Sequence, residues 1–149
     1  MRRLKMEENK IFFDSNILIY HLCGKVEAKK LIEKVENKEI CGFINPIVIS
    51  EVLFFYIRAT TNKRHYDIKK HPEILKSLDL DIVFELFSIF QILDLNSEIV
   101  KISREIIKKY CLLPNDALIC STCKFYKINK ICSFDDDFKR VDFLEIIEI

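Results

Sequence analysis

Four acidic residues from separate segments of the chain are the strongest candidates for a shared site: Asp14, Glu51, Asp116 and Asp135. Asp14 follows the apolar run IFF and Asp135 follows ICSF, so each would lie at the carboxyl end of a short strand. Ligands of open α/β sheets bind outside that edge. Asp116 stands in the first turn of a helix predicted after Pro114, where the helix dipole alone would also favour an acid.

Glu51 lies in a strongly apolar stretch of the chain. Between positions 46 and 57 the only polar side chains are Ser50, Glu51 and Tyr56. A carboxylate in such a helix is costly to bury unless it is paired or binds a cation. The alternative is a narrow exposed stripe that Glu51 shares with Arg58.

Carboxylates that meet at one sheet edge repel one another and need compensating positive charge. Hard oxygen ligands without a nearby histidine or cysteine indicate Mg²⁺ or Mn²⁺ rather than zinc. Such a cation suits phosphodiester hydrolysis, because it polarises the phosphate and lowers the pKa of a bound water. If the four acids meet, the sequence predicts a metal-dependent hydrolase.

Short apolar runs alternate with helical patterns along the chain, which predicts an α/β fold with a mostly parallel central sheet covered by helices. Asn45-Pro46 and Asn96-Ser97 are helix start signals. The predicted strands are 11–13, 39–45, 91–95, 130–134 and 144–149. The predicted helices are 26–37, 46–59, one near Pro72, 79–90, 98–110 and one from about Pro114, in which Ala117, Leu118 and Phe125 should face inward.

Composition narrows the class of protein. A length of 149 residues, half of them hydrophobic, predicts one packed domain over positions 1–149, with 1–9 as a peripheral extension. The formal charge of +1 means that any nucleic-acid binding must rest on local patches. We find no signal peptide or apolar run long enough for a membrane span, so we expect a cytoplasmic protein with reduced cysteines.

The spacing of Cys120 and Cys123 is that of many zinc sites. There is no second such pair, and none of the three histidines is close in the sequence. We therefore expect small residues on a buried helix face, with a structural zinc or a disulfide as alternatives.

Four motifs together resemble those of the PIN-domain nucleases, and among these the VapC-type toxins of prokaryotic toxin–antitoxin pairs. They are FFDSNILIY (12–20), VISEVLF (48–54), LPNDALICSTC (113–123) and SFDDDF (133–138), and the resemblance runs from about Lys10 to Ile149. Each motif alone is common, whereas all four in this order are specific.

The resemblance implies roles for individual residues. Asp14, Glu51, Asp116 and Asp135 match the acids that hold the metal, and Asp137 is a weaker candidate at the edge of the site.

Three neighbours of these acids also match positions of the motifs. Asn16 and Ser133 correspond to polar positions beside the acids, and Asp136 occupies a variable position. Asp136 stands where many relatives carry a basic residue, and Phe134 is apolar where many are polar.

The resemblance also implies a three-layer α/β/α fold, Mg²⁺-dependent (or Mn²⁺-dependent) endoribonuclease activity, homodimerisation and neutralisation by a cognate antitoxin. An RNA-processing nuclease outside any toxin system and an inactive PIN-like binding module are the alternatives. A phosphatase with an aspartate nucleophile is disfavoured, because Asp14-Ser15-Asn16 lacks the second carboxylate of its D-x-D signature.

Two basic segments could neutralise RNA phosphates, with Tyr66 or Tyr126 available to stack on a base. Ordinary solvated faces are the alternative. The candidate residues are Lys63, Arg64, Lys69, Lys70, Lys124 and Lys127.

Overall fold

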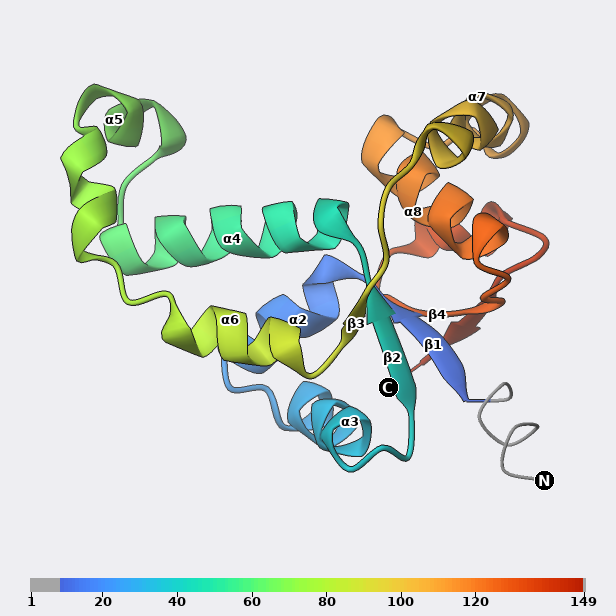
Figure 1. Ribbon diagram of the computed structural model, residues 1–149, viewed down its shortest axis with the longest axis horizontal. Coiled ribbons are helices and arrows are strands. Elements are labelled where there is room, and N and C mark those ends of the chain that lie inside the picture. Colours follow the sequence, from blue (N-terminus) through green and yellow to red (C-terminus); the bar gives the residue numbers. More distant parts are fainter. Residues whose placement is uncertain (1–8, 149) are drawn as a thin grey trace.

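The computed structural model describes residues 9–148 and has a five-stranded, all-parallel sheet with helices on both faces (Figure 1). This confirms the predicted three-layer α/β fold. The expected extension over positions 1–9 lies outside the described residues, except for Asn9, whose carbonyl accepts a hydrogen bond from the Cys41 amide.

The strand order in the sheet is β3-β2-β1-β4-β5. The strands are β1 Lys10–Phe13, β2 Cys41–Ile44, β3 Gln91–Ile92, β4 Lys130–Cys132 and β5 Glu145–Ile147. The strands β1, β2 and β4 are mostly buried apolar runs, as expected for parallel strands covered on both faces. Central β1 pairs with β2 through Ile11 and Gly42 and with β4 through Phe13 and Cys132.

Gly42 is required by a close approach of side chains to the sheet. A Cβ atom at this position would lie 2.8 Å from the Phe90 ring and 2.9 Å from the Val35 side chain. Glycine therefore lets the side chains of Val35 and Phe90 pack directly on β2.

Helix starts follow the predicted signals: the Asn45 and Asn96 side chains accept hydrogen bonds from the backbone amides of Val48 and Ile99. Near Pro72 the structure has a 3₁₀ helix rather than an α-helix. The helices are α2 Ser15–Leu22, α3 Val26–Glu36, α4 Pro46–Thr61, α5 His65–Lys70, α6 Asp81–Ser88, α7 Ser97–Tyr110 and α8 Pro114–Phe125, with 3₁₀ helices η1 Pro72–Ser77 and η2 Asp136–Arg140.

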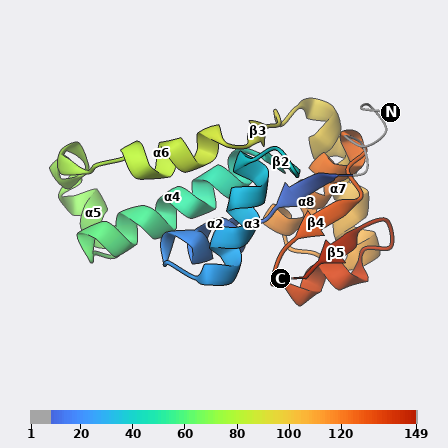
Figure 2. The ribbon, with the colours of Figure 1, turned by 90° about the horizontal axis from the view of Figure 1, so that it is seen from below.

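The order in which strands are added to the sheet reverses between β1 and β4, although all strands run parallel. It first steps from β1 to β2 and β3, with α2 and α3 on one face, and then returns beyond β1 to β4 through α7 and α8 on the other face (Figures 1 and 2). The carboxyl ends of β1 and β4 therefore border the point where ligands of open α/β sheets bind.

The helix α8 packs its small side chains into the core. Cys120 and Cys123 are completely buried and unbridged, and they belong to no metal-binding cluster within residues 9–148, which favours the packing interpretation. Ala117 is buried as expected. The prediction that Phe125 faces inward was wrong: this last residue of α8 is 40% exposed, because the helix ends at the surface.

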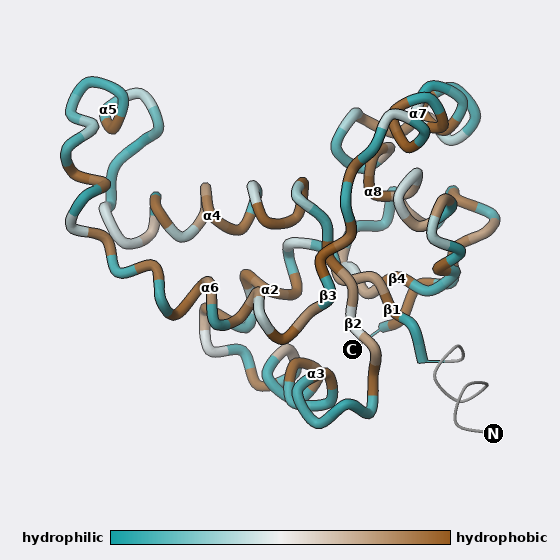
Figure 3. Tube along the Cα trace, viewed as in Figure 1, coloured by the Kyte–Doolittle hydropathy of each residue, from teal (hydrophilic) through white to brown (hydrophobic). Residues whose placement is uncertain are grey.

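The segment α4–α5–η1–α6 forms an arm that extends away from the sheet (Figures 1 and 2). Although α4 is strongly apolar (Figure 3), only Val48 and Val52 on it are fully buried. None of the helices between residues 9 and 148 combines the length and the apolar character needed to cross a membrane.

Candidate active site

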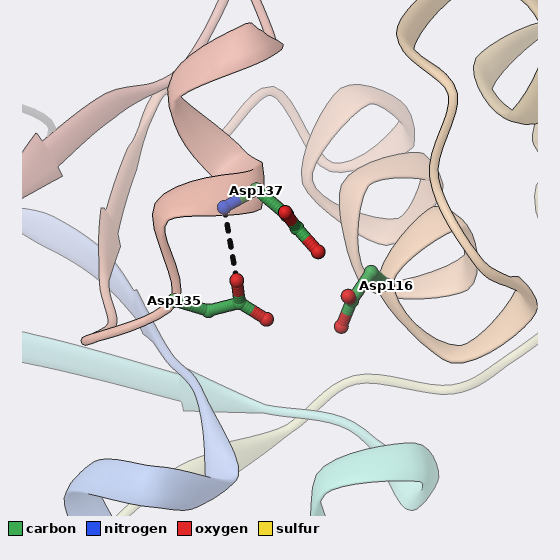
Figure 4. A group of neighbouring side chains, drawn as sticks. All are labelled: Asp116, Asp135 and Asp137. Atoms are coloured by element: carbon green, nitrogen blue, oxygen red, sulfur yellow. Dashed lines mark hydrogen bonds between the residues drawn. The ribbon is translucent and has the colours of Figure 1, made fainter.

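Three carboxylates converge at the carboxyl edge of the sheet: Asp116, Asp135 and Asp137 (Figure 4). Asp116 comes from the first turn of α8, Asp135 from the turn after β4, and Asp137 from η2. One oxygen of each lies within 4.8 Å of the others. This is the only group of its kind among the described residues.

The turn at η2 directs Asp137 into this acid cluster. Asp135 caps η2, and its Oδ1 accepts a hydrogen bond of 2.9 Å from the Asp137 amide. Arg140 then pairs with Asp137, at 3.1 Å from Nη1 to Oδ1. Arg140 also donates to the carbonyls of Tyr110 and Cys111 at the end of α7, each at 2.9 Å. Asp137 is thus held by Asp135 at the start of η2 and, through Arg140, by the end of α7.

Asp14 lies beside the cluster and joins the ends of β1 and β4. It is only 5% exposed. Its Oδ1 accepts from the Ser15 amide at 2.8 Å, and its Oδ2 accepts from the Ser133 hydroxyl at 2.6 Å. The same Ser133 oxygen accepts from Asn16 Nδ2 at 3.3 Å and from the Asp135 amide at 3.0 Å. Ser133 and Asn16 therefore link Asp14 to the backbone of Asp135 through hydrogen bonds.

Glu51 reaches the same region from α4. Its Oε1 is buried and has no hydrogen-bond partner within residues 9–148. The side chains of Ser15 and Asn115 lie close enough to lower the pKa of Glu51, but burial and the charge of Asp14 raise it. An unpaired buried carboxylate oxygen is a group that a cation, a water or a substrate would satisfy.

Burial, together with the charges of neighbouring acids, raises the pKa values of Asp14, Glu51 and Asp116. Burial and then the charges of Asp135, Asp14, Glu51 and Asp137 raise the pKa of Asp116 to about 7. Burial also raises the pKa of Asp14, against the hydrogen bond from Ser133. Arg140 offsets the charge of Asp137, whereas the raised pKa values of Asp14, Glu51 and Asp116 reflect uncompensated negative charge, as expected for carboxylates that bind a cation.

A buried hydrogen bond sets the spacing between α4 and α8. Asn45 Nδ2 donates to the Thr122 hydroxyl at 2.9 Å, and both side chains are completely buried. Because Asn45 also caps α4, the helix that carries Glu51 is tied to the helix that carries Asp116.

The fold brings the predicted acids to one edge, although not all into one cluster. Asp14 and Glu51 act on the pKa of Asp116 but stand outside the three-acid cluster. Asp137, expected only at the edge of the site, is one of its members. Asp136 points elsewhere and pairs with Lys139 at 2.9 Å.

Sequence reasoning missed three residues around the acids: Ser15, Asn115 and Arg140. Ser15 lies inside the D-S-N motif, so its position was a usable signal. Asn115 likewise lies inside the motif LPNDALICSTC, whereas Arg140 looks like an ordinary surface residue in the sequence and reaches the site only through the turn of η2.

The structure does not bring the predicted basic residues to the acid cluster. Lys63, Arg64, Lys69 and Lys70 lie at or beside α5, at the far end of the α4 arm (Figure 1). Lys124 and Lys127 line a hollow together with Lys10, at the amino end of β1. They therefore lie at the opposite edge of the sheet from the acids.

The donor set of the site fits a divalent cation. All candidate ligands are carboxylate oxygens, the type that Mg²⁺ and Mn²⁺ prefer. Asp116, Asp135 and Asp137 could each supply one oxygen, and Glu51 Oε1 is available nearby.

Comparison with known proteins gives two findings on the sequence. The family model of the PIN domain matches residues 11–144. Ribonuclease VapC6 of Methanocaldococcus jannaschii is 40% identical over an aligned length of 155 residues, which covers 96% of this chain and 99% of that protein.

Solved structures with the same fold include a toxin–antitoxin complex from Klebsiella pneumoniae, with a TM-score of 0.62 and 22% identity. A DNA-bound VapBC structure from Salmonella typhimurium has a TM-score of 0.65 and 17% identity. Each match covers 93% of this chain and 96% of the other. At this level of identity the likeness concerns the fold.

Proposed function

The chain belongs to the PIN-domain family, and from this premise we propose that it is a metal-dependent endoribonuclease that hydrolyses RNA phosphodiester bonds. The observation that carries the proposal is the convergence of Asp116, Asp135 and Asp137 beside Asp14 and Glu51. The name of the relative that is 40% identical, a ribonuclease, supports the choice of RNA.

Mg²⁺ or Mn²⁺ is the proposed cofactor. Asp116, Asp135 and Asp137 would hold the cation directly, while Asp14 and Glu51 would hold it directly or through water. When bound, such a cation supplies Lewis-acid polarisation of the phosphate and lowers the pKa of a water molecule.

The residues around the acids have separate tasks in this proposal. Both oxygens of Asp14 are engaged by Ser15 and Ser133, so Asp14 is held in one orientation. Ser133 transmits this order to the backbone of Asp135. Glu51 Oε1, buried without a partner among the described residues, can accept a hydrogen bond from the attacking water. Because these side chains are already oriented before the substrate binds, the barrier of the chemical step is lower.

The test is an RNA cleavage assay with Mg²⁺, with Mn²⁺ and with a chelator. Asp14→Asn and Asp116→Asn should each lower kcat/KM by at least about a hundredfold, because several kcal/mol of charge stabilisation are lost. Asp136→Asn is the matched control, since this acid is adjacent in sequence but pairs with Lys139 outside the cluster. Equal activity of the wild type and Asp14→Asn would refute the proposal.

We further propose that the protein is the toxin of a toxin–antitoxin pair, acts in the cytoplasm as a homodimer and binds a cognate antitoxin. The names of the similar structures support this role. A groove of about 890 Å³ on the arm, lined by side chains that include Phe54, Tyr66 and Leu75, offers apolar surface to a partner.

Expression in a host cell tests the toxin role. The wild type should arrest growth, and the product of a short neighbouring reading frame should restore it and co-purify. Light scattering of the free protein should give the mass of two chains. A processing nuclease would cleave RNA without arresting growth.

A further inference from the structure

Two exposed aromatic rings pack against each other beside the acid cluster. Tyr20 of α2 and Phe134 of the turn after β4 have ring centroids 4.7 Å apart and an interplanar angle of 58°. They are 43% and 46% exposed, so neither ring belongs to the core. The pair leaves flat apolar surface in water, where a stacking ligand could cover it.

The hydrogen-bond network of the acids reaches the backbone of Phe134. Phe134 directly precedes Asp135, so their Cα atoms are about 3.8 Å apart. The Phe134 amide donates to Asn16 Oδ1 at 3.4 Å, and Asn16 Nδ2 donates to the Ser133 hydroxyl that holds Asp14. The aromatic pair and the acids therefore form one connected arrangement.

Beside the pair lies a hollow of about 280 Å³, lined by Tyr20, Lys25, Glu27, Ala28 and Phe134. This volume is just below the roughly 300–1,000 Å³ of pockets that enclose drug-sized molecules. It suits one flat heterocycle at the surface rather than a folded ligand. Lys25 can provide positive charge for a phosphate, and the Glu27 carboxylate can accept from an amino group.

We propose that Tyr20 and Phe134 form a stacking platform for one unpaired base of the RNA, next to the phosphate that is cleaved. This inference rests on the proposed ribonuclease function. Aromatic side chains hold unstacked bases of single-stranded RNA in this way, and every base offers a suitable face. A paired base is stacked within its helix, so the platform selects single-stranded RNA at that nucleotide.

The kinetic test uses a short single-stranded RNA with one mapped cleavage bond and copies that lack one base beside it. The wild type should lose roughly tenfold or more in kcat/KM on one such abasic RNA. On intact RNA, Phe134→Ala should show the same loss relative to the wild type. On that abasic RNA it should be no slower than the wild type, because removing the ring and removing the base delete the same contact. Phe134→Tyr should keep most of the activity.

Phe84→Ala is the matched control. Phe84 is 52% exposed and packs on Phe87 at 5.5 Å in α6, away from the acids, so its removal should leave cleavage unchanged. The platform is refuted if the wild type cleaves every abasic RNA at the same rate as intact RNA. It is equally refuted if the loss caused by the abasic site and the loss caused by Phe134→Ala multiply. It is also refuted if Phe134→Ala changes the oligomeric state and leaves RNA kinetics unchanged.

Binding without cleavage separates this inference from the proposed function. A fluorescent adenine analogue at the stacked position should be quenched when Asp14→Asn protein binds the RNA in chelator, and Phe134→Ala in that background should abolish the quenching. Cleavage without quenching would overturn the platform and leave the nuclease intact. Quenching without cleavage by the wild type in metal would overturn the nuclease.

Discussion

At the scale of single residues, Asp116 is the acid whose pKa depends most visibly on its surroundings. Burial and four neighbouring carboxylates raise its pKa from 3.8 to about 7. An acid with a raised pKa in the folded state binds its proton more tightly there than in the unfolded chain. Folding stability without metal should therefore fall as pH rises from about 4 through 7.

Thermal unfolding in chelator at pH 5 and pH 8 measures this effect. The wild type should have the lower Tm at pH 8, and Asp116→Asn should reduce the difference. Mn²⁺ should raise the Tm of the wild type at pH 8, because it binds the folded state. Asp136→Asn should behave like the wild type; a variant Asp116→Asn with an unchanged pH dependence would contradict the assignment of this carboxyl.

The sequence identifies most of these acids because each follows a recognisable local signal. An apolar strand ending in an acid marks Asp14 and Asp135. The run of three aspartates does not reveal that Asp137 turns back toward Asp116, because that depends on the 3₁₀ turn capped by Asp135. The same turn directs Asp136 to Lys139 instead.

At the scale of elements, Arg140 holds η2 against the end of α7. Arg140→Gln removes two hydrogen bonds to carbonyls and the pair with Asp137, so the free energy of unfolding should fall by about 1–2 kcal/mol. Lys139→Gln is the control, because it breaks only the exposed pair with Asp136, and such pairs contribute little. Equal destabilisation in urea titrations would contradict this role of Arg140.

The contact between α4 and α8 depends on Asn45. Asn45→Ala removes the helix cap and leaves the buried Thr122 hydroxyl without its donor, so we expect a loss of about 2–3 kcal/mol in chemical denaturation. Thr122→Val should also destabilise the fold. The double variant should cost less than the sum, since both changes break one bond; additive losses would show that the two side chains act independently.

Helix starts were predictable because asparagine and proline mark them chemically, whereas helix interiors were harder to orient. Phe125 fits the apolar pattern of α8 but comes at its last turn, where the core has ended. Similarly, Pro72 correctly marks a start, but the six residues of η1 make a 3₁₀ helix. Tertiary packing, not local sequence, decides both outcomes.

At the scale of the whole molecule, the basic residues lie in two separate places. An RNA bound at the acid cluster would follow a different path to each of them. Along α4, Thr61 is about 15 Å from Glu51, and α5 with Lys69 and Lys70 follows it. Lys124 and Lys127 face the opposite edge of the sheet.

Reversing the charge of Lys69 and Lys70 should therefore weaken RNA binding and flatten its salt dependence, with kcat unchanged. The same reversal at Lys124 and Lys127 should have a smaller effect. Fluorescence anisotropy over a range of salt concentrations measures both. Unchanged affinity in the first variant would leave the arm as an ordinary solvated surface.

The bond from Ser133 to Asp14 spans 119 residues of sequence, and it has a consequence for synthesis. A ribosome releases β1, α2 and α4 long before β4, and β1 has no β4 partner until then. The nascent chain therefore cannot assemble its acid cluster until the segment around residue 137 has emerged. For an enzyme that cleaves RNA, this means that the incomplete chain cannot cut the ribosomal RNA or the messenger RNA while they are still producing it.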